Sequence, residues 1–184
     1  SANNFVNIKL EVQSVVNEYN KPECYIHIAI APTKNMDRVE WFLEKTVEMG
    51  IDEISFIQTA KSERKDLKMI RLEKIAVSAM KQSKKAYLPK LNPLIKLNEF
   101  LKRDFNNFEK YVAYVNHDNT SYLHELANKK KHYLVVIGPE GDFSKEEISL
   151  MTKKDFQCIS LGKSVLRTET AGISVCNTLN MINL

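Results

Sequence analysis

The apolar positions along the chain change their spacing several times, and each pattern predicts an element. Residues 5–16 alternate roughly between apolar and polar and are rich in valine, which predicts one or two strands. Residues 24–30 and 133–137 are apolar runs that also predict strands. In residues 36–49 the apolar side chains recur at helical spacing and Gly50 supplies a stop signal, so we expect a helix there.

The rest of the pattern predicts further strands and helices in alternation. A long helix is expected over residues 65–85, followed by Pro89 and Pro93. The other expected strands are 53–58, 111–115 and 157–161, and the other expected helices are 97–102, 121–128, 144–153 and 169–182. Alternation from residue 24 onward predicts the α/β class, with a mostly parallel sheet and helices on both faces. Ligands bind such sheets beyond the carboxyl ends of the strands.

Composition limits the class of protein. A chain of 184 residues suits one domain, or one domain plus a fragment of another. Apolar residues make up 43% and charged residues 27%, which is typical of a soluble globular protein. No run approaches the ~20 apolar residues that a membrane span needs, and the N-terminus lacks the pattern of a signal peptide. We therefore expect no membrane partner.

The cysteines predict neither a disulfide framework nor a metal site. Cys24, Cys158 and Cys176 are odd in number and far apart, and no C-x-x-C or Cys/His cluster is present. This usage indicates a reducing cytoplasm. Cys176 falls in an apolar helical stripe, so we expect it in the core.

The net charge of +4 is by itself weak evidence for a nucleic-acid partner. Its distribution is more informative, because several basic residues of the expected long helix fall roughly on one face and could contact RNA phosphates. An ordinary solvated helix face explains the same pattern equally well. The candidate RNA-binding residues are Lys34, Arg38, Arg71, Lys74, Lys81 and Lys85.

The turn in "IGPEGDFSKEEI", residues 137–148, is the first candidate ligand site. Gly138 and Gly141 have no Cβ, so the backbone there can take positive φ and approach a ligand closely. Ser144 and Glu147 form a capping-box pattern at the start of a helix. The glycine pattern is too short for a dinucleotide fingerprint and no Walker lysine follows, so we expect no phosphate loop. An ordinary strand-to-helix connection remains the alternative.

Residues 159–171, "ISLGKSVLRTETA", repeat the layout of strand, glycine-containing loop and helix. Taken singly, Thr168 or Thr170 could cap the helix, Glu169 could offset its dipole and Arg167 could be a surface cation. That interpretation does not account for both loops together. Two neighbouring loops at one edge of a parallel sheet could enclose a single ligand.

These two stretches closely resemble two signatures of the RsmE-type 16S ribosomal RNA uridine N3-methyltransferases, which belong to the SPOUT superfamily. Two further stretches agree in order. Residues 34–54 resemble the family's region around a Lys-x-x-Glu-Leu-Gly motif, and residues 79–89 resemble its Gln-Ser-x-Arg motif. The resemblance covers about residues 24–182.

The chain departs from the family at several positions. Asp142 stands where the family usually has glycine, and Lys85 replaces an arginine, which keeps the charge but loses the bidentate fork. The family also carries a small β-rich PUA-like RNA-binding domain at its N-terminus. Residues 1–20 look like a remnant of that domain, with the SPOUT methyltransferase domain over 24–184. We therefore expect a fragment that binds cofactor but recognises RNA poorly.

The resemblance implies a fold with a C-terminal trefoil knot and a pocket for S-adenosylmethionine. Backbone groups of both loops would hydrogen-bond the adenine and ribose, and Leu161 and Leu166 would cover the purine. Such pockets are usually completed across a two-fold interface, so we expect a homodimer that uses the last helix. The residues expected to bind the cofactor are Gly138, Pro139, Glu140, Gly141, Leu161, Gly162, Leu166 and Thr170.

The implied reaction is methyl transfer to N3 of a uridine in 16S ribosomal RNA of the small subunit. N3–H is a weak acid, so the enzyme must promote loss of its proton or stabilise the uracil anion. Arg167 could neutralise charge on a uracil oxygen, and Glu169 is the nearest carboxylate that could accept the proton.

Two rival functions stay open. One keeps the fold but methylates a ribose 2′-hydroxyl, although the asparagine- and arginine-containing motif of those SPOUT families is not found here. The other is a non-catalytic RNA- or nucleotide-binding module, which the short N-terminus and Asp142 favour. The presence of both pocket loops argues against it.

Overall fold

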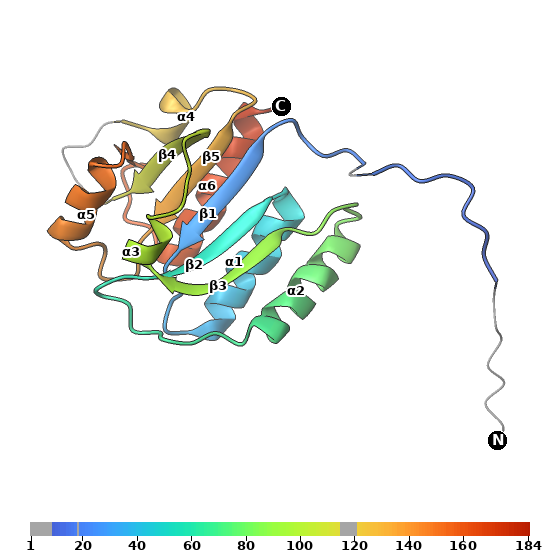
Figure 1. Cartoon of the computed structure of the whole chain (residues 1–184), viewed down its shortest axis with the longest axis horizontal. Helices are drawn as coiled ribbons and strands as arrows, with labels where there is room; N and C mark the ends of the chain where they lie inside the picture. The colour runs from blue at the N-terminus through green and yellow to red at the C-terminus, as the bar shows by residue number, and fades with distance from the viewer. Residues whose placement is uncertain (1–8, 18, 115–120) are drawn as a thin grey trace, which may run out of the picture.

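The chain folds around one parallel sheet, as a computed structural model describing residues 9–17, 19–114 and 121–184 shows (Figure 1). The strands are β1 (Tyr25–Ile30), β2 (Glu53–Gln58), β3 (Lys90–Lys96), β4 (Phe108–Ala113), β5 (His132–Ile137) and β6 (Gln157–Ile159). Their order in the sheet is β3-β2-β1-β5-β4-β6, and each neighbouring pair is parallel. The predicted α/β class is therefore confirmed.

Helices cover both faces of the sheet, as predicted. They are α1 (Met36–Met49), α2 (Met69–Gln82), α3 (Leu97–Phe100), α4 (Leu123–Leu126), α5 (Lys145–Thr152) and α6 (Thr168–Ile182). The apolar side chains of α1, α2, α4 and α6 pack on one face, and those of α3 and α5 pack on the other. Both faces of the central strands are buried, so their side chains are apolar with little alternation.

Local capping signals fix two of the helices where the sequence predicts them. The Asn35 side chain accepts a hydrogen bond from Asp37 N at 2.9 Å at the start of α1. Gly50 ends that helix in the left-handed region, with φ of 112°. Ser144 and Glu147 form the predicted capping box at the start of α5.

Several elements differ from the prediction. Helix α2 begins at Met69 rather than at residue 65, and α4 is a single turn within the predicted 121–128. Strand β3 was not predicted, because Pro93 lies inside it. Proline lacks an N–H group and is tolerated only on edge strands, and β3 is an edge of this sheet. The last residue of the predicted strand 111–115 lies outside the described residues.

The strand prediction for the N-terminus is wrong over residues 9–16, while residues 5–8 lie outside the described part. Residues 9–16 are extended without a ladder partner in the described chain, and Leu10 and Val12 are 88% and 75% exposed. Residues 9–17 run away from the domain (Figure 1). Alternation produces a strand only where a partner pairs with the backbone groups.

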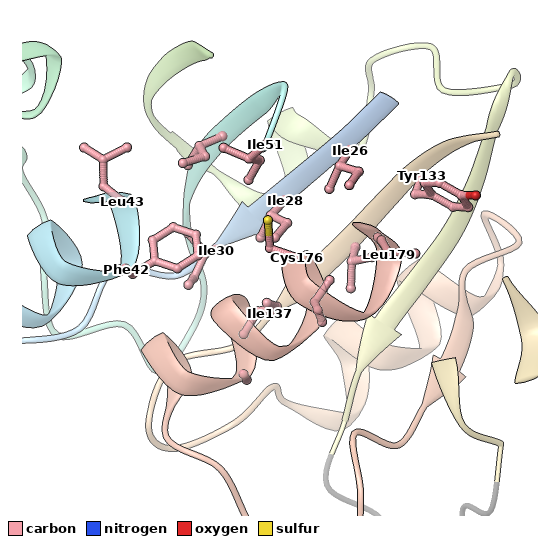
Figure 2. Close-up of a cluster of buried hydrophobic side chains, with 14 of the residues drawn as sticks. Ile26, Ile28, Ile30, Phe42, Leu43, Ile51, Tyr133, Ile137, Cys176 and Leu179 are labelled. Carbon is pink, nitrogen blue, oxygen red and sulfur yellow. The ribbon is translucent and has the colours of Figure 1, made fainter. Parts of the chain in front are cut away.

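Helix α6 packs closely on β1, β5 and α1, and this packing places the loop that precedes it. Figure 2 shows the Cys176 side chain of α6 beside Ile28 of β1. Cys176 is fully buried, as predicted, and burial raises the pKa of its thiol to about 12, so it is no nucleophile at neutral pH. A Cβ on Gly172 would lie 2.4 Å from Phe42 Cε2, so only glycine fits there without movement of α1 or α6.

Candidate cofactor site

A cavity of about 600 Å³ lies at the carboxyl ends of β4, β5 and β6. Its floor includes the last residues of these strands, Ala113, Ile137 and Ile159. One wall is the turn that follows β5, and the opposite wall is the loop of residues 160–167 that follows β6. The cavity has the size of a small-molecule site and lies at the sheet edge where α/β proteins bind ligands.

The two walls are joined by a buried hydrogen bond. Thr168 is 5% exposed, and its Oγ1 donates to the Gly138 carbonyl oxygen at 3.0 Å, across 30 residues of sequence. The prediction that both loops face one another is therefore confirmed. The capping interpretation of Thr168 and Thr170 is wrong, because Arg167 is the N-cap of α6 and no side chain makes a capping bond.

The left-handed residue of the first turn is not a glycine. Gly138 and Gly141 do not have positive φ; the left-handed residue is Asp142, with φ of 58°. Aspartate tolerates this conformation because its short side chain bonds locally, and here Oδ1 accepts from Phe143 N at 2.8 Å. Space is tight at Gly138, since a Cβ would lie 3.0 Å from the Phe143 ring and the ring would have to shift by a few tenths of an ångström. Asp142 thus occupies a left-handed position where the family usually has glycine.

The second loop is held by backbone and hydroxyl contacts. Gly162 has φ of 132°, Ser160 Oγ donates to its carbonyl at 3.1 Å, and its N–H donates back to Ser160 Oγ at 3.3 Å. Ser160 N donates to the Ser121 carbonyl at 2.9 Å, which ties the loop to the connection after β4. Leu161 and Leu166 are half-buried against the core and also line the cavity, so they form an apolar wall.

The structure brings most of the predicted cofactor residues together. Gly138, Pro139, Glu140, Leu161, Gly162 and Leu166 line the cavity, whereas Gly141 and Thr170 do not. Tyr114 and Tyr122 also line it, and no sequence pattern indicated either of them. Tyr122 reaches the site through a parallel bridge with Ser160, a contact across 38 residues that no local pattern encodes.

The two predicted catalytic residues have different environments. Arg167 is exposed and lines the cavity. Glu169 is 5% exposed and is not part of the cavity lining; its Oε1 lies 3.5 Å from Arg38 Nε. The other oxygen, Oε2, is buried without a hydrogen-bond partner among the described residues. A buried carboxylate oxygen without a hydrogen-bond donor is energetically costly, so a functional reason for this oxygen is expected.

The predicted RNA-binding residues do not form a row of free cations. Three of them are paired with carboxylates: Lys34 with Glu63 at 3.0 Å, Arg38 with Glu169 at 3.5 Å, and Arg71 with Glu40 at 2.5 Å. Lys74 and Lys81 are exposed on α2. Lys85 is half-buried beyond the end of α2, with Nζ 5.7 Å from the centre of the Tyr87 ring.

In the described ranges, no group of three His, Cys, Asp or Glu side chains could hold a metal ion. No helix in these ranges has the length and apolar character needed to cross a membrane.

Comparison with known proteins identifies the family. The family description "RNA methyltransferase domain" matches residues 20–180. The chain belongs to this family. The family that the two loop signatures resemble is thereby confirmed.

Relatives and solved structures agree with this assignment. Ribosomal RNA small subunit methyltransferase E of Mesomycoplasma hyopneumoniae is 29% identical over 170 residues, covering 90% of this chain and 73% of that protein. The crystal structure of a probable rRNA-methyltransferase from Porphyromonas gingivalis is 41% identical, with a TM-score of 0.83, covering 88% of this chain and 69% of that one. A putative methyltransferase from Legionella pneumophila, solved in complex with the bound cofactor SAM, is 29% identical, with a TM-score of 0.81, covering 91% and 69%.

Proposed function

We propose that the chain is an S-adenosylmethionine-dependent methyltransferase that methylates N3 of a uridine in 16S ribosomal RNA of the small subunit. The observation that carries the proposal is the cavity between the Gly138 turn and the 160–167 loop, closed by the bond from Thr168 to Gly138. The family supports RNA methylation, and the Mesomycoplasma relative is named for the small-subunit ribosomal RNA.

The walls of the cavity fit this cofactor. Leu161 and Leu166 give an apolar surface for the purine, and the carboxylates of Glu140 and Asp142 at the cavity complement the positive sulfonium and ammonium groups. When bound, the cofactor supplies a methyl group that needs little activation. The protein must therefore orient the uracil, exclude water and promote loss of the N3 proton.

Arg167 is proposed to neutralise the charge that develops on the uracil, and Glu169 is proposed to accept the N3 proton. Arg167 lines the cavity, so its guanidinium would neutralise charge on a uracil oxygen as N3 loses its proton. Glu169 lies outside the cavity lining, so it would accept the proton through a bridging water; its Oε2 has no partner among the described residues, and its Oε1 stays paired with Arg38. The pair with Arg38 would hold the carboxylate in one orientation.

The nature of the product tests the proposal. Assembled small subunits that lack the modification are incubated with excess protein and cofactor, and the RNA is digested to nucleosides for mass spectrometry. We expect 3-methyluridine. A ribose-methylated nucleoside would support the 2′-O rival instead. Failure of the chain to bind cofactor in a calorimetric titration would support the non-catalytic module.

Three structural features belong to the same proposal. The chain from β6 into α6 is proposed to pass beneath the connection between β4 and β5 and so form a trefoil knot; α4 of that connection and α6 pack in one apolar cluster. Two copies are proposed to pair through α6, where Met181 is 60% exposed. Residues 1–20 stay a proposed remnant of a PUA-like domain.

A further inference from the structure

The connection that follows β2 lies against the turn of residues 138–143 that follows β5, although about 80 residues separate the two in sequence. Lys61 Nζ donates to the carbonyl oxygens of Gly141 at 2.7 Å and Phe143 at 3.2 Å. Ala60 N donates to Glu147 Oε1 at 2.8 Å. The other oxygen of Glu147 accepts from Ser144 N, so one carboxylate joins this connection to the start of α5.

The stem of Lys61 also packs on the turn. A Cβ added to Gly141 would lie 3.3 Å from Lys61 Cδ and 3.6 Å from Lys61 Cβ. Gly141 does not have positive φ and does not line the cavity, so neither strain nor ligand contact explains a glycine there. The close approach of Lys61 favours a residue without a Cβ at this position, because a Cβ would push the lysine stem away by a few tenths of an ångström.

The far end of the same connection holds a second loop. Arg64 Nε donates to the Thr33 carbonyl at 3.0 Å, and its Nη2 donates to the Lys34 carbonyl. Between the two ends, Ser62 Oγ accepts from Thr59 N at 2.9 Å and Ser62 N donates to the Thr59 carbonyl at 3.2 Å. Residues 59–64 thus form a local turn that is hydrogen-bonded to the loops after β1 and β5.

We infer that Lys61 is a positioning residue for the cofactor, an inference that rests on the proposed function. Its two bonds reach the carbonyls on either side of the left-handed Asp142 and so hold the turn whose residues Gly138 to Glu140 line the cavity. From its sequence alone Lys61 would be taken for one more cation for RNA phosphates. In the structure its ammonium is directed at backbone oxygens of the turn.

Three variants test this role. Lys61→Met keeps the stem over Gly141 and removes only the ammonium. Lys61→Arg restores a cation that can reach both carbonyls. Lys65→Met is the matched control, since Lys65 is an exposed lysine of the same connection. Affinity for S-adenosylmethionine is measured by calorimetry and the melting temperature by circular dichroism.

We expect Lys61→Met to weaken cofactor binding about 5–10-fold, the loss of one hydrogen bond from a charged group at a largely exposed site. Lys61→Arg should recover most of that loss, Lys65→Met should bind as the unaltered chain does, and all variants should melt within about 3 °C of it.

Unchanged cofactor affinity in Lys61→Met would overturn the inference, and so would loss of RNA binding alone, which would make Lys61 a phosphate contact. A large fall in melting temperature that arginine does not recover would reduce Lys61 to a stability role and overturn it as well. Absence of cofactor binding by the unaltered chain would refute the proposed function itself, a result distinct from these.

Discussion

Replacement of Gly172 by alanine should destabilise the protein although alanine favours helices. The added Cβ would lie 2.4 Å and 2.7 Å from two carbons of the Phe42 ring and 3.3 Å from Ile30 Cδ1. Carbon atoms in contact normally lie about 3.5–4.0 Å apart, so the ring must move by about 1 Å. Phe42 is 1% exposed, and Figure 2 shows its ring beside Ile30 in the core. The ring cannot move without displacing its neighbours.

The expected cost follows from two opposing terms. Overpacking a well-packed core costs about 1–3 kcal/mol, and alanine stabilises a helix interior by about 1 kcal/mol relative to glycine. Because the clash is with a buried ring, we expect a net loss of about 1–2 kcal/mol. For a chain of this length that lowers the melting temperature by about 2–8 °C.

Urea denaturation followed by circular dichroism measures the change, and a double-mutant cycle identifies its cause. In a Phe42→Leu background the ring atoms that clash are absent, so Gly172→Ala should cost at least ~1 kcal/mol less than in the unaltered chain. Ser78→Ala, at an exposed position of α2, is the control and should be neutral or slightly stabilising. An alanine at 172 that is harmless, or equally costly in both backgrounds, would refute the packing argument.

Further predictions concern catalysis, pH, the turn and assembly. Arg167→Ala should lower turnover about 10²–10³-fold with little change in cofactor affinity, and Arg167→Lys should restore only part; joint loss of cofactor binding and thermal stability would instead make Arg167 a structural residue. Burial lowers the pKa of His27 to about 4, so the unfolded chain binds its proton at higher pH than the folded chain does. Stability should therefore fall as the pH drops from about 6.5 to about 4, by about 3 kcal/mol at most from this group, and a His27→Gln variant should show a shallower slope in pH-dependent urea titrations. Asp142→Gly should be nearly neutral in thermal melts because the position is left-handed, whereas Asp142→Val should cost about 1–2 kcal/mol; equal melting temperatures for the two would contradict this. Light scattering at tens of micromolar should show a dimer, and a monomer there would refute pairing through α6.

The sequence alone determined the elements whose signals are local. Helix α1 has a side-chain cap at Asn35 and a glycine stop at Gly50, and helix α5 has a complete capping box, so their boundaries were predicted closely. Strands β1 and β5 are apolar runs bounded by polar residues, and they form the predicted core of the sheet. The two loop signatures identified the family because the residues that form a site after a strand are contiguous in sequence.

Other features depend on partners that are distant in sequence. Residues 9–16 have a strand pattern but no strand partner in the part of the chain that the structure describes, and β3 is a strand despite Pro93 because it lies at the edge of the sheet. The register of β3 against β2 shifts between Ser55 and Ile57, close to that proline. The β propensity of a segment shows only that it can form a strand, and a strand forms where another strand pairs with it.

The site shows the same division. The sequence selected the two turns, but contacts from distant segments hold them: Thr168 bonds to the Gly138 carbonyl, and Lys61 packs over Gly141. The pairing of Arg38 with Glu169 joins residues 131 positions apart, and no local pattern indicated that Arg38, a candidate RNA-binding residue, would face a buried carboxylate. A sequence pattern records which side chains are available at each position. Only the tertiary structure decides which of them meet, because a contact or an ion pair depends on distances of a few ångströms between segments that the chain itself does not connect.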